Sequence, residues 1–348
     1  MTRSSPTNAS SWAAAAQQAL DAKVKPVGAL GRLEDLGRRL ASLQESLAPR
    51  VDAAQVSVFA GDHGVSAEDV SAYPSAVTRQ MMSVYADGGA AVSVLGRTAG
   101  VTTEAVDVGV NADLSALDEV IHAKVRRGTR NLRREAAMTA DECEAALNVG
   151  RTAVRRAADN GVKALGLGEM GIGNTTAAAA LCSALTDVPA SKTVGPGTGV
   201  TGERLARKRA VVRDAVTAVR DEGGRPPEAL LARLGGLELA AIAGAAHEAP
   251  AHGMAVVADG FVSTVAVLAA VRMEPSIRTA CFFAHRSPEP GHDIALEALD
   301  ADPLLDLDLR LGEGTGAALA IPLLRAGADL LRDMDTVAEA GVDMESDR

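Results

Sequence analysis

The sequence predicts an α/β protein, a parallel sheet flanked by helices, with a small helical domain built from both termini. Short runs rich in β-branched residues alternate with longer alanine-rich helical patterns, and these runs are apolar on both faces, as buried parallel strands are. The helical patterns at the two ends have no strand between them. We therefore expect an α/β domain at 51–316 and a discontinuous helical domain at 1–50 plus 317–348.

The elements follow from these patterns in order. The expected strands are residues 56–60, 103–108, 162–167, 254–258 and 277–283. The expected helices between them are residues 77–96, 141–160, 175–185, 202–219 and 237–246, and the flanking helices are 13–22, 30–47 and 317–337. This βαβ rhythm is typical of a Rossmann-like sheet, whose ligand crevice lies at the carboxyl ends of the strands. Polar residues follow three strand ends there, at 61–64, 168–169 and 259–260.

Composition limits the function classes. The 348 residues are nearly half apolar, which is enough for one large core or two smaller ones. The 35 basic and 45 acidic residues give a net charge of −10 without a dense basic face, so nucleic acid is not an expected partner. No apolar run is long enough for a membrane span or a signal peptide, and we expect a cytoplasmic protein. Cys143, Cys182 and Cys281 are too scattered for a disulfide framework and are expected to be buried apolar groups.

Three glycine-rich loops carry carboxylates and hydroxyls. They are Gly-Glu-Met-Gly-Ile-Gly-Asn-Thr-Thr at 168–176, Gly-Pro-Gly-Thr-Gly at 195–199 and Gly-Glu-Gly-Thr-Gly at 312–316. Glycines let backbone N–H groups turn toward an anion, and a following helix adds its positive N-terminal end. Together the loops predict a phosphorylated ligand whose chemistry happens next to a carboxylate.

One of these loops also fits a dinucleotide pattern. Residues 166–171 read G-x-G-x-x-G after an expected strand and before an expected helix, which predicts an NAD-dependent oxidoreductase as the alternative function. Glu169 inside that turn would repel a pyrophosphate, and no acidic residue about 20 positions further on is well placed to hold a ribose. This alternative would also leave the other two glycine loops without a function.

Six motifs stand in one order along most of the chain. They are KPVGALGRLE at 25–34, FAGDHGV at 59–65, GEMGIGNTT at 168–176, GPGTG at 195–199, HRSPEPGH at 285–292 and LRLGEGTG at 309–316. In this order the chain resembles the nicotinate-nucleotide:dimethylbenzimidazole phosphoribosyltransferase family of cobalamin biosynthesis. The resemblance implies transfer of the 5-phosphoribosyl group of nicotinate mononucleotide to 5,6-dimethylbenzimidazole, with inversion at C1′, giving α-ribazole 5′-phosphate and nicotinate. It also implies a homodimer and a reaction without a cofactor, and it leaves the preferred azole base open.

The resemblance assigns the two catalytic carboxylates. Glu313 matches the general base that removes the N–H proton of the azole, and Glu169 matches the second acidic residue, expected to stabilise positive charge on the ribosyl ring. Each has a simpler interpretation: Glu313 as a glutamate near a helix N-terminus, and Glu169 as a cap of the helix expected near Thr175.

The resemblance and the loop chemistry together assign the binding residues. The phosphate and nucleotide are expected to contact Gly171, Gly173, Asn174, Thr175, Gly197, Thr198, Gly199 and Lys208. The azole is expected to contact Tyr73, Gln80, Met81, Leu311 and Gly312. Lys208 could instead lie on a solvated helix face beside three arginines, and Met81 could be a core residue.

A metal site is not expected. His63, His285 and His292 accompany Asp62, but their spacing matches no known ligand pattern. We expect these histidines to form structural hydrogen bonds at the rim of the crevice.

Overall fold

The structure is a computed structural model that describes residues 9–221 and 225–343. Within these residues, six strands form one sheet in which all neighbouring strands are parallel. The strands are β1 (Ala54–Gly61), β2 (Thr102–Gly109), β3 (Val120–His122), β4 (Ala164–Met170), β5 (Ala255–Ala258) and β6 (Cys281–Phe283). Their spatial order, β3-β2-β1-β4-β5-β6, is that of a doubly wound sheet, and it confirms the predicted Rossmann-like α/β class.

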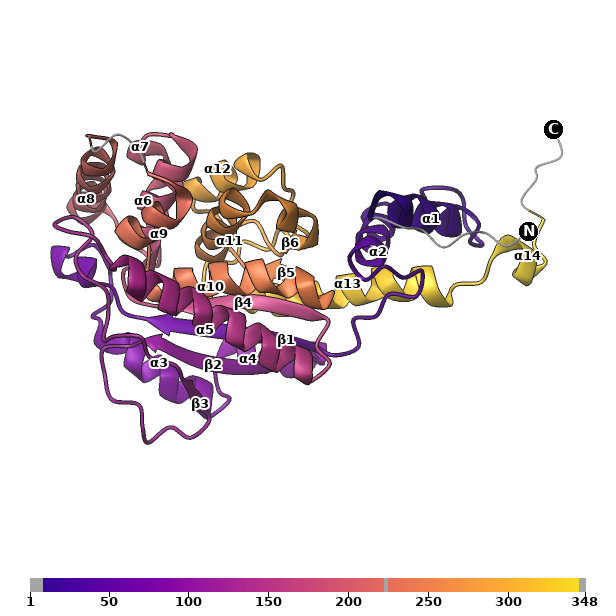
Figure 1. Ribbon diagram of the computed structural model, residues 1–348, viewed down its shortest axis with the longest axis horizontal. Coiled ribbons are helices and arrows are strands. Elements are labelled where there is room, and N and C mark those ends of the chain that lie inside the picture. Colours follow the sequence, from indigo (N-terminus) through magenta and orange to yellow (C-terminus); the bar gives the residue numbers. More distant parts are fainter. Residues whose placement is uncertain (1–8, 222–224, 344–348) are drawn as a thin grey trace.

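Helices cover both faces of this sheet (Figure 1). Alternate side chains of β1 enter different cores, Phe59 on the face under α10 and Val58 on the face under α13. The α-helices are α1 (Ala9–Asp21), α2 (Arg32–Leu43), α3 (Ala76–Ala86), α4 (Ala91–Ala99), α5 (Ala140–Asp159), α6 (Asn174–Thr186), α7 (Ala190–Thr193), α8 (Gly202–Asp221), α9 (Pro227–Leu234), α10 (Leu237–Glu248), α11 (Phe261–Met273), α12 (Pro290–Ala298), α13 (Thr315–Asp333) and α14 (Val337–Ala340). None of the helices in the described part of the chain is long and apolar enough to cross a bilayer.

Some predicted boundaries were wrong. The single helix expected at 77–96 is two helices, α3 and α4, because Gly88 takes a left-handed conformation between them (φ +67°). The strand expected at 277–283 begins only at Cys281, since Pro275 starts a 3₁₀ helix, η3 (Pro275–Ala280). Two further 3₁₀ helices are η1 (Gly64–Glu68) and η2 (Ala249–His252).

Other elements had no expected counterpart. Helix α11 is buried on all sides, so its sequence has no polar face to give a helical period. Strand β3 is a three-residue edge strand paired only with β2. Short or fully apolar segments carry too little periodicity to be assigned from sequence alone.

The two ends of the chain meet beyond one edge of the sheet. Helices α1 and α2 pack against the far half of α13 through Leu20, Ala41 and Leu331 (Figure 1). Helices α2 and α13 cross closely: a Cβ on Gly37 would lie 2.5 Å from the carbonyl oxygen of Gly327. The first half of α13 packs on the sheet instead, so this one helix contributes to both groups.

The predicted division into domains at 51–316 and at 1–50 plus 317–348 stays a prediction. Residues 1–8 and 344–348 of the expected small domain lie outside the described residues.

The sheet defines where a ligand crevice is expected. The chain runs outward in both directions from β1 and β4, so their carboxyl ends form the topological switch point. Glu169 lies at the end of β4, Asp259 directly follows β5, and His285 is the second residue after β6. These three side chains therefore approach one edge of the sheet.

Candidate active site

A cavity of about 560 Å³ lies at this edge. Of the predicted site residues, those that line it are Tyr73, Met81, Glu169, Gly171, Gly173, Asn174, Thr175, Gly197, Thr198, Lys208, Leu311, Gly312 and Glu313. Gln80 and Gly199 are not among the lining residues. The structure thus brings together residues that are up to 240 positions apart in the chain.

Glu169 and Glu313 approach the cavity from adjacent backbones. A Cβ on Gly168 of β4 would lie 2.5 Å from the carbonyl oxygen of Glu313, and a Cβ on Gly312 would collide with the Glu169 carboxylate. Glycine at these two positions lets the loop before α13 lie directly against the end of β4. Glu313 itself is a non-glycine residue with a left-handed backbone, φ +65°. Such a conformation is held only by surrounding structure and is common at functional sites.

Both carboxylates are buried, and burial raises the pKa of each. The negative charges of Glu238 and Asp259 add to the rise at Glu169, and that of Asp259 adds to the rise at Glu313. Among the described residues, Glu313 Oε2 has no hydrogen-bond partner within normal geometry, and the buried Tyr85 hydroxyl beside this carboxylate opposes the rise in its pKa. A buried carboxylate with a raised pKa and a free oxygen is suited to accept a proton from a ligand.

Asp259 fixes the loop that carries Glu313. Its Oδ2 accepts a hydrogen bond from the backbone N–H of Gly314 at 3.1 Å, and its Oδ1 accepts one from Ala317 N–H at 3.0 Å. Both amides belong to the N-terminus of α13, where backbone donors lack helical partners. Asp259 therefore provides hydrogen-bond acceptors for two amides at the start of α13, and one of these amides belongs to Gly314, which directly follows Glu313. The sequence placed Asp259 at a strand end but did not reveal this contact.

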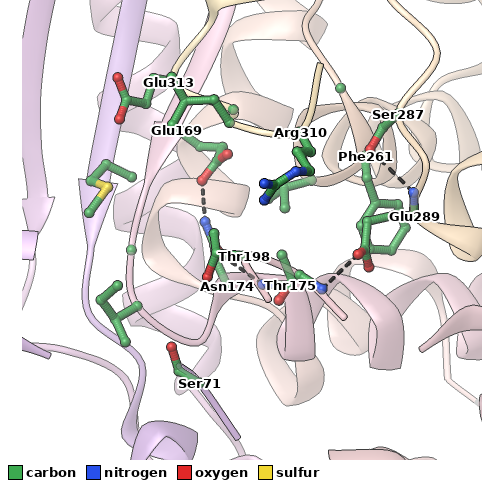
Figure 2. A pocket seen from close by; sticks show the side chains of 18 of the residues that line it. Ser71, Glu169, Asn174, Thr175, Thr198, Phe261, Ser287, Glu289, Arg310 and Glu313 are labelled. Atoms are coloured by element: carbon green, nitrogen blue, oxygen red, sulfur yellow. Dashed lines mark hydrogen bonds between the residues drawn. The ribbon is translucent and has the colours of Figure 1, made fainter. Parts of the chain in front are cut away.

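Asn174 orients the other carboxylate. Its side-chain Nδ2 donates to Glu169 Oε2, while its Oδ1 accepts from Thr175 N–H at 2.7 Å (Figure 2). The interpretation of Glu169 as a simple cap of α6 is wrong, because Glu169 contacts the Asn174 side chain and the first-turn amide is bound by Asn174. Asn174 thus joins the start of α6 to the cavity.

Lys208 is buried in the wall of the cavity. Its Nζ donates to Thr175 Oγ1 at 2.9 Å and to the carbonyl oxygen of Gly195 at 3.0 Å. Burial lowers the pKa of Lys208 to about 8, and the charge of Glu289 opposes that shift. The alternative of a solvated lysine is therefore wrong, although the neighbouring Arg204, Arg207 and Arg209 on α8 are exposed.

Two backbone amides predicted to bind phosphate have protein partners. Gly197 N–H donates to Glu289 Oε1 at 2.6 Å, and Gly199 N–H donates to the carbonyl oxygen of Pro196 at 3.2 Å. Gly199 therefore serves the turn after Pro196, and it lies outside the cavity lining. Gly197 stays beside Lys208 but does not present a free donor.

The predicted azole-binding residues of α3 lie on different faces of the helix. Val77 and Met81 lie one turn apart on α3 and both line the cavity, whereas Gln80 is exposed and is not among the lining residues. Contact of Gln80 with the azole stays a prediction. Tyr73 and Leu311 are 51% and 52% exposed at the mouth.

The three histidines differ from one another. His63 Nε2 contacts Glu238 Oε1 at 2.6 Å, and His292 contacts Thr264 Oγ1 at 3.1 Å, so both have the expected structural hydrogen bonds. His285 is buried in the cavity wall, and neither of its ring nitrogens has a hydrogen-bond partner among the described residues. The expectation of a structural hydrogen bond was wrong for His285. Within residues 9–221 and 225–343, no group of three or more His, Cys, Asp or Glu side chains is arranged to hold a metal ion.

Sequence reasoning placed Asp259 and Gly260 at a strand end of the crevice and His285 at its rim, but gave them no part in binding. It did not single out Phe261, Val262, Ser263, Ser287, Glu289, Asp308 and Arg310, which also line the cavity. Most follow β5 or β6, so their position after a strand end was the available signal.

The glycines of the dinucleotide pattern have another use here. Gly166 and Gly168 lie inside β4 and not in a turn after it. A Cβ on Gly166 would lie 2.7 Å from Val56 and 3.0 Å from Ala317, so this glycine allows α13 to pack closely on the sheet. The pattern at 166–171 is therefore not the strand-turn-helix that a dinucleotide site requires.

Comparisons with known proteins all match phosphoribosyltransferases. The model of a family described as phosphoribosyltransferase matches residues 6–342. The chain is 51% identical to a nicotinate-nucleotide–dimethylbenzimidazole phosphoribosyltransferase from Pseudomonas aeruginosa, covering 92% of each chain, and 48% identical to one from Chromobacterium violaceum, covering 96% of each. A crystal structure of CobT from Thermus thermophilus matches with a TM-score of 0.92 and 48% identity, covering 96% of this chain and 99% of that one.

Proposed function

We propose, starting from the fact that the chain belongs to this phosphoribosyltransferase family, that it transfers the 5-phosphoribosyl group of nicotinate mononucleotide to 5,6-dimethylbenzimidazole. The products are α-ribazole 5′-phosphate and nicotinate, and the step belongs to cobalamin biosynthesis. The oxidoreductase alternative is not favoured, because neither the relatives nor the geometry of β4 supports it.

One observation carries this proposal. Two buried carboxylates, Glu169 and Glu313, and one buried lysine, Lys208, line a single cavity large enough for a nucleotide. Charged side chains are rarely buried without a functional or structural partner. This transfer requires a general base, a group that stabilises positive charge and a group that binds the phosphate of the substrate.

Glu313 acts as the general base in this proposal. One ring nitrogen of the azole attacks C1′ from the face opposite nicotinate, and the C1′–N bond to the pyridinium breaks with its electron pair going to the ring nitrogen. The proton on the other azole nitrogen passes to the Glu313 carboxylate, so the azole product and the departing ring are uncharged at nitrogen. Inversion at C1′ follows from the opposite-face attack. The raised pKa of Glu313 improves it as a base near neutral pH.

Glu169 stabilises the ribosyl group as positive charge develops on it. Asn174 holds one carboxylate oxygen in place, so this charge is oriented before the substrate binds. No leaving-group acid is needed, because nicotinate already departs from a pyridinium.

Lys208, Thr175 and the start of α6 bind the 5′-phosphate. The Lys208 ammonium and the Thr175 hydroxyl are 2.9 Å apart, and Gly171 and Gly173 precede the helix whose N-terminus faces the cavity. Thr198 and Gly197 add a wall on the other side of the lysine. The azole would contact Tyr73, Met81, Leu311 and Gly312 at the mouth.

We also propose that the working form is a cytoplasmic homodimer. Val27 is 73% exposed on the loop between α1 and α2, and a buried Lys25–Glu34 ion pair of 2.9 Å holds that loop in shape. The dimer is proposed from the resemblance to the family, and Val27 is one apolar side chain of this loop that a second copy could cover. Light scattering on the purified chain tests the dimer, and cell fractionation tests the location.

Mass spectrometry of the products tests the activity. The purified protein is incubated with nicotinate mononucleotide and dimethylbenzimidazole, and the mass of α-ribazole phosphate should appear together with free nicotinate. Glu313→Gln serves as the matched control and should form little product. Absence of that mass with the wild-type protein would overturn the proposed function.

A further inference from the structure

Arg310 lies in the loop before α13, three residues ahead of Glu313. Its guanidinium projects into the cavity between Glu169 and Phe261 (Figure 2). Among the described residues that line the cavity, Lys208 and Arg310 are the two with cationic side chains of the lysine and arginine type. Lys208 is buried in the wall, whereas Arg310 is exposed to the cavity and solvent.

Arg310 is unpaired in a cavity rich in acidic groups. Within residues 9–221 and 225–343, its guanidinium forms no hydrogen bond or ion pair. Two carboxylates of the cavity lining have other partners: Asp259 accepts hydrogen bonds from the amides of α13, and Glu289 Oε1 accepts one from Gly197 N–H. An arginine with five free donors, left unpaired among carboxylates, is available to an anionic ligand.

We propose that Arg310 binds the ring carboxylate of the departing pyridine and thereby selects the nicotinate nucleotide over its carboxamide analogue. This inference rests on the proposed function. The nucleotide has two anionic groups, a 5′-phosphate and a ring carboxylate, and the cavity lining has two side chains of the lysine and arginine type. Lys208 of α8 donates a hydrogen bond to Thr175 at the start of α6, where a phosphate is best bound, which leaves Arg310 for the carboxylate.

The chemistry of the two groups explains the selection. A guanidinium presents parallel N–H donors that match both oxygens of a carboxylate. A carboxamide offers one acceptor oxygen and turns an NH₂ donor toward the second N–H, so one hydrogen bond and the ionic attraction are lost. Because the ring carboxylate keeps its charge throughout the reaction, the contact is the same in the ground and transition states. Its loss should therefore appear mainly in KM.

The test compares two nucleotides with the wild type and Arg310→Gln. For nicotinate mononucleotide, the variant should lose about 10- to 100-fold in kcat/KM, most of it in KM. For nicotinamide mononucleotide, which has the same phosphate, the change should stay within about threefold. Arg310→Lys should fall between the wild type and Arg310→Gln. Arg209→Gln removes the same charge from an exposed site on α8 outside the cavity and should behave as wild type.

Product inhibition gives a second readout that does not need turnover of the amide nucleotide. The inhibition constant of nicotinate should rise in Arg310→Gln, while that of nicotinamide should not. An equal loss with both nucleotides would place Arg310 at the phosphate and overturn the inference, as would no loss with either. A wild-type protein that forms no azole riboside phosphate would instead overturn the proposed function.

Discussion

Asn in place of Asp259 tests whether this residue positions the general base. Asp259 uses both carboxylate oxygens, one for Gly314 N–H and one for Ala317 N–H. Asn has the same shape but only one acceptor oxygen, and its NH₂ group would face the second amide. The substitution therefore removes one charge-assisted hydrogen bond next to Glu313 without opening a cavity.

The structure sets the size of the effect. A hydrogen bond to a charged group contributes about 1.5–3 kcal/mol, and Asp259 is 2% exposed, so solvent does not replace the lost contact. We expect the free energy of unfolding, measured by urea denaturation, to fall by about that amount. Because the left-handed Glu313 depends on this anchor, kcat should fall about 10- to 100-fold. The KM for nicotinate mononucleotide should change little, since Lys208 is untouched.

The pH profile separates positioning from a general loss of structure. The charge of Asp259 raises the pKa of Glu313, so its removal should lower that pKa. A general base works when ionised, and activity is lost as pH falls through its pKa. The acid limb of the kcat profile should therefore move to lower pH in Asp259→Asn. Asp293→Asn, an exposed carboxylate on α12 outside the cavity, is the matched control. An unchanged kcat, or an acid limb that moves to higher pH, would refute the reasoning.

Three further predictions concern the same site. Glu313→Gln should lower kcat by about 100- to 10,000-fold with near-normal substrate affinity. If a folded variant keeps more than about a tenth of wild-type kcat, the general base is another residue, and Glu169 is the next candidate. Lys208→Ala should raise the KM for nicotinate mononucleotide more than it lowers kcat, because a phosphate contact persists from the ground state to the transition state. Steady-state kinetics measures both constants, and a change confined to kcat would contradict the prediction. Turnover should continue in EDTA, since the leaving group is already cationic; loss of activity restored by magnesium would show a metal requirement.

The class of fold and the identity of the chemical groups can be predicted from the order of residues alone. Alternating buried strands and amphipathic helices predict a parallel sheet, because local periodicity reflects which side chains face a core. Helix α5 shows this most clearly: its polar and apolar residues alternate at helical spacing, and Thr139 and Glu142 close its start with a capping box. Glu169, Glu313 and the glycines of the ordered motifs, together with Lys208 after the second glycine loop, were also identified from the sequence, through the resemblance to a known family.

Which of these groups lie together in the site depends on how distant elements pack. Gln80 and Met81 are adjacent in sequence, yet helical phase sends one to solvent and the other into the cavity. Asp259 accepts a hydrogen bond from the amide of Gly314, next to Glu313 and more than 50 residues further along the chain, and Gly197 N–H donates to Glu289. Helix α11, which is buried at every position from 261 to 270, and the three-residue strand β3 show no hydrophobic periodicity. The physical reason is the same in each case: local sequence sets which residues form an element, whereas hydrogen-bond partners and side-chain direction depend on how distant elements pack.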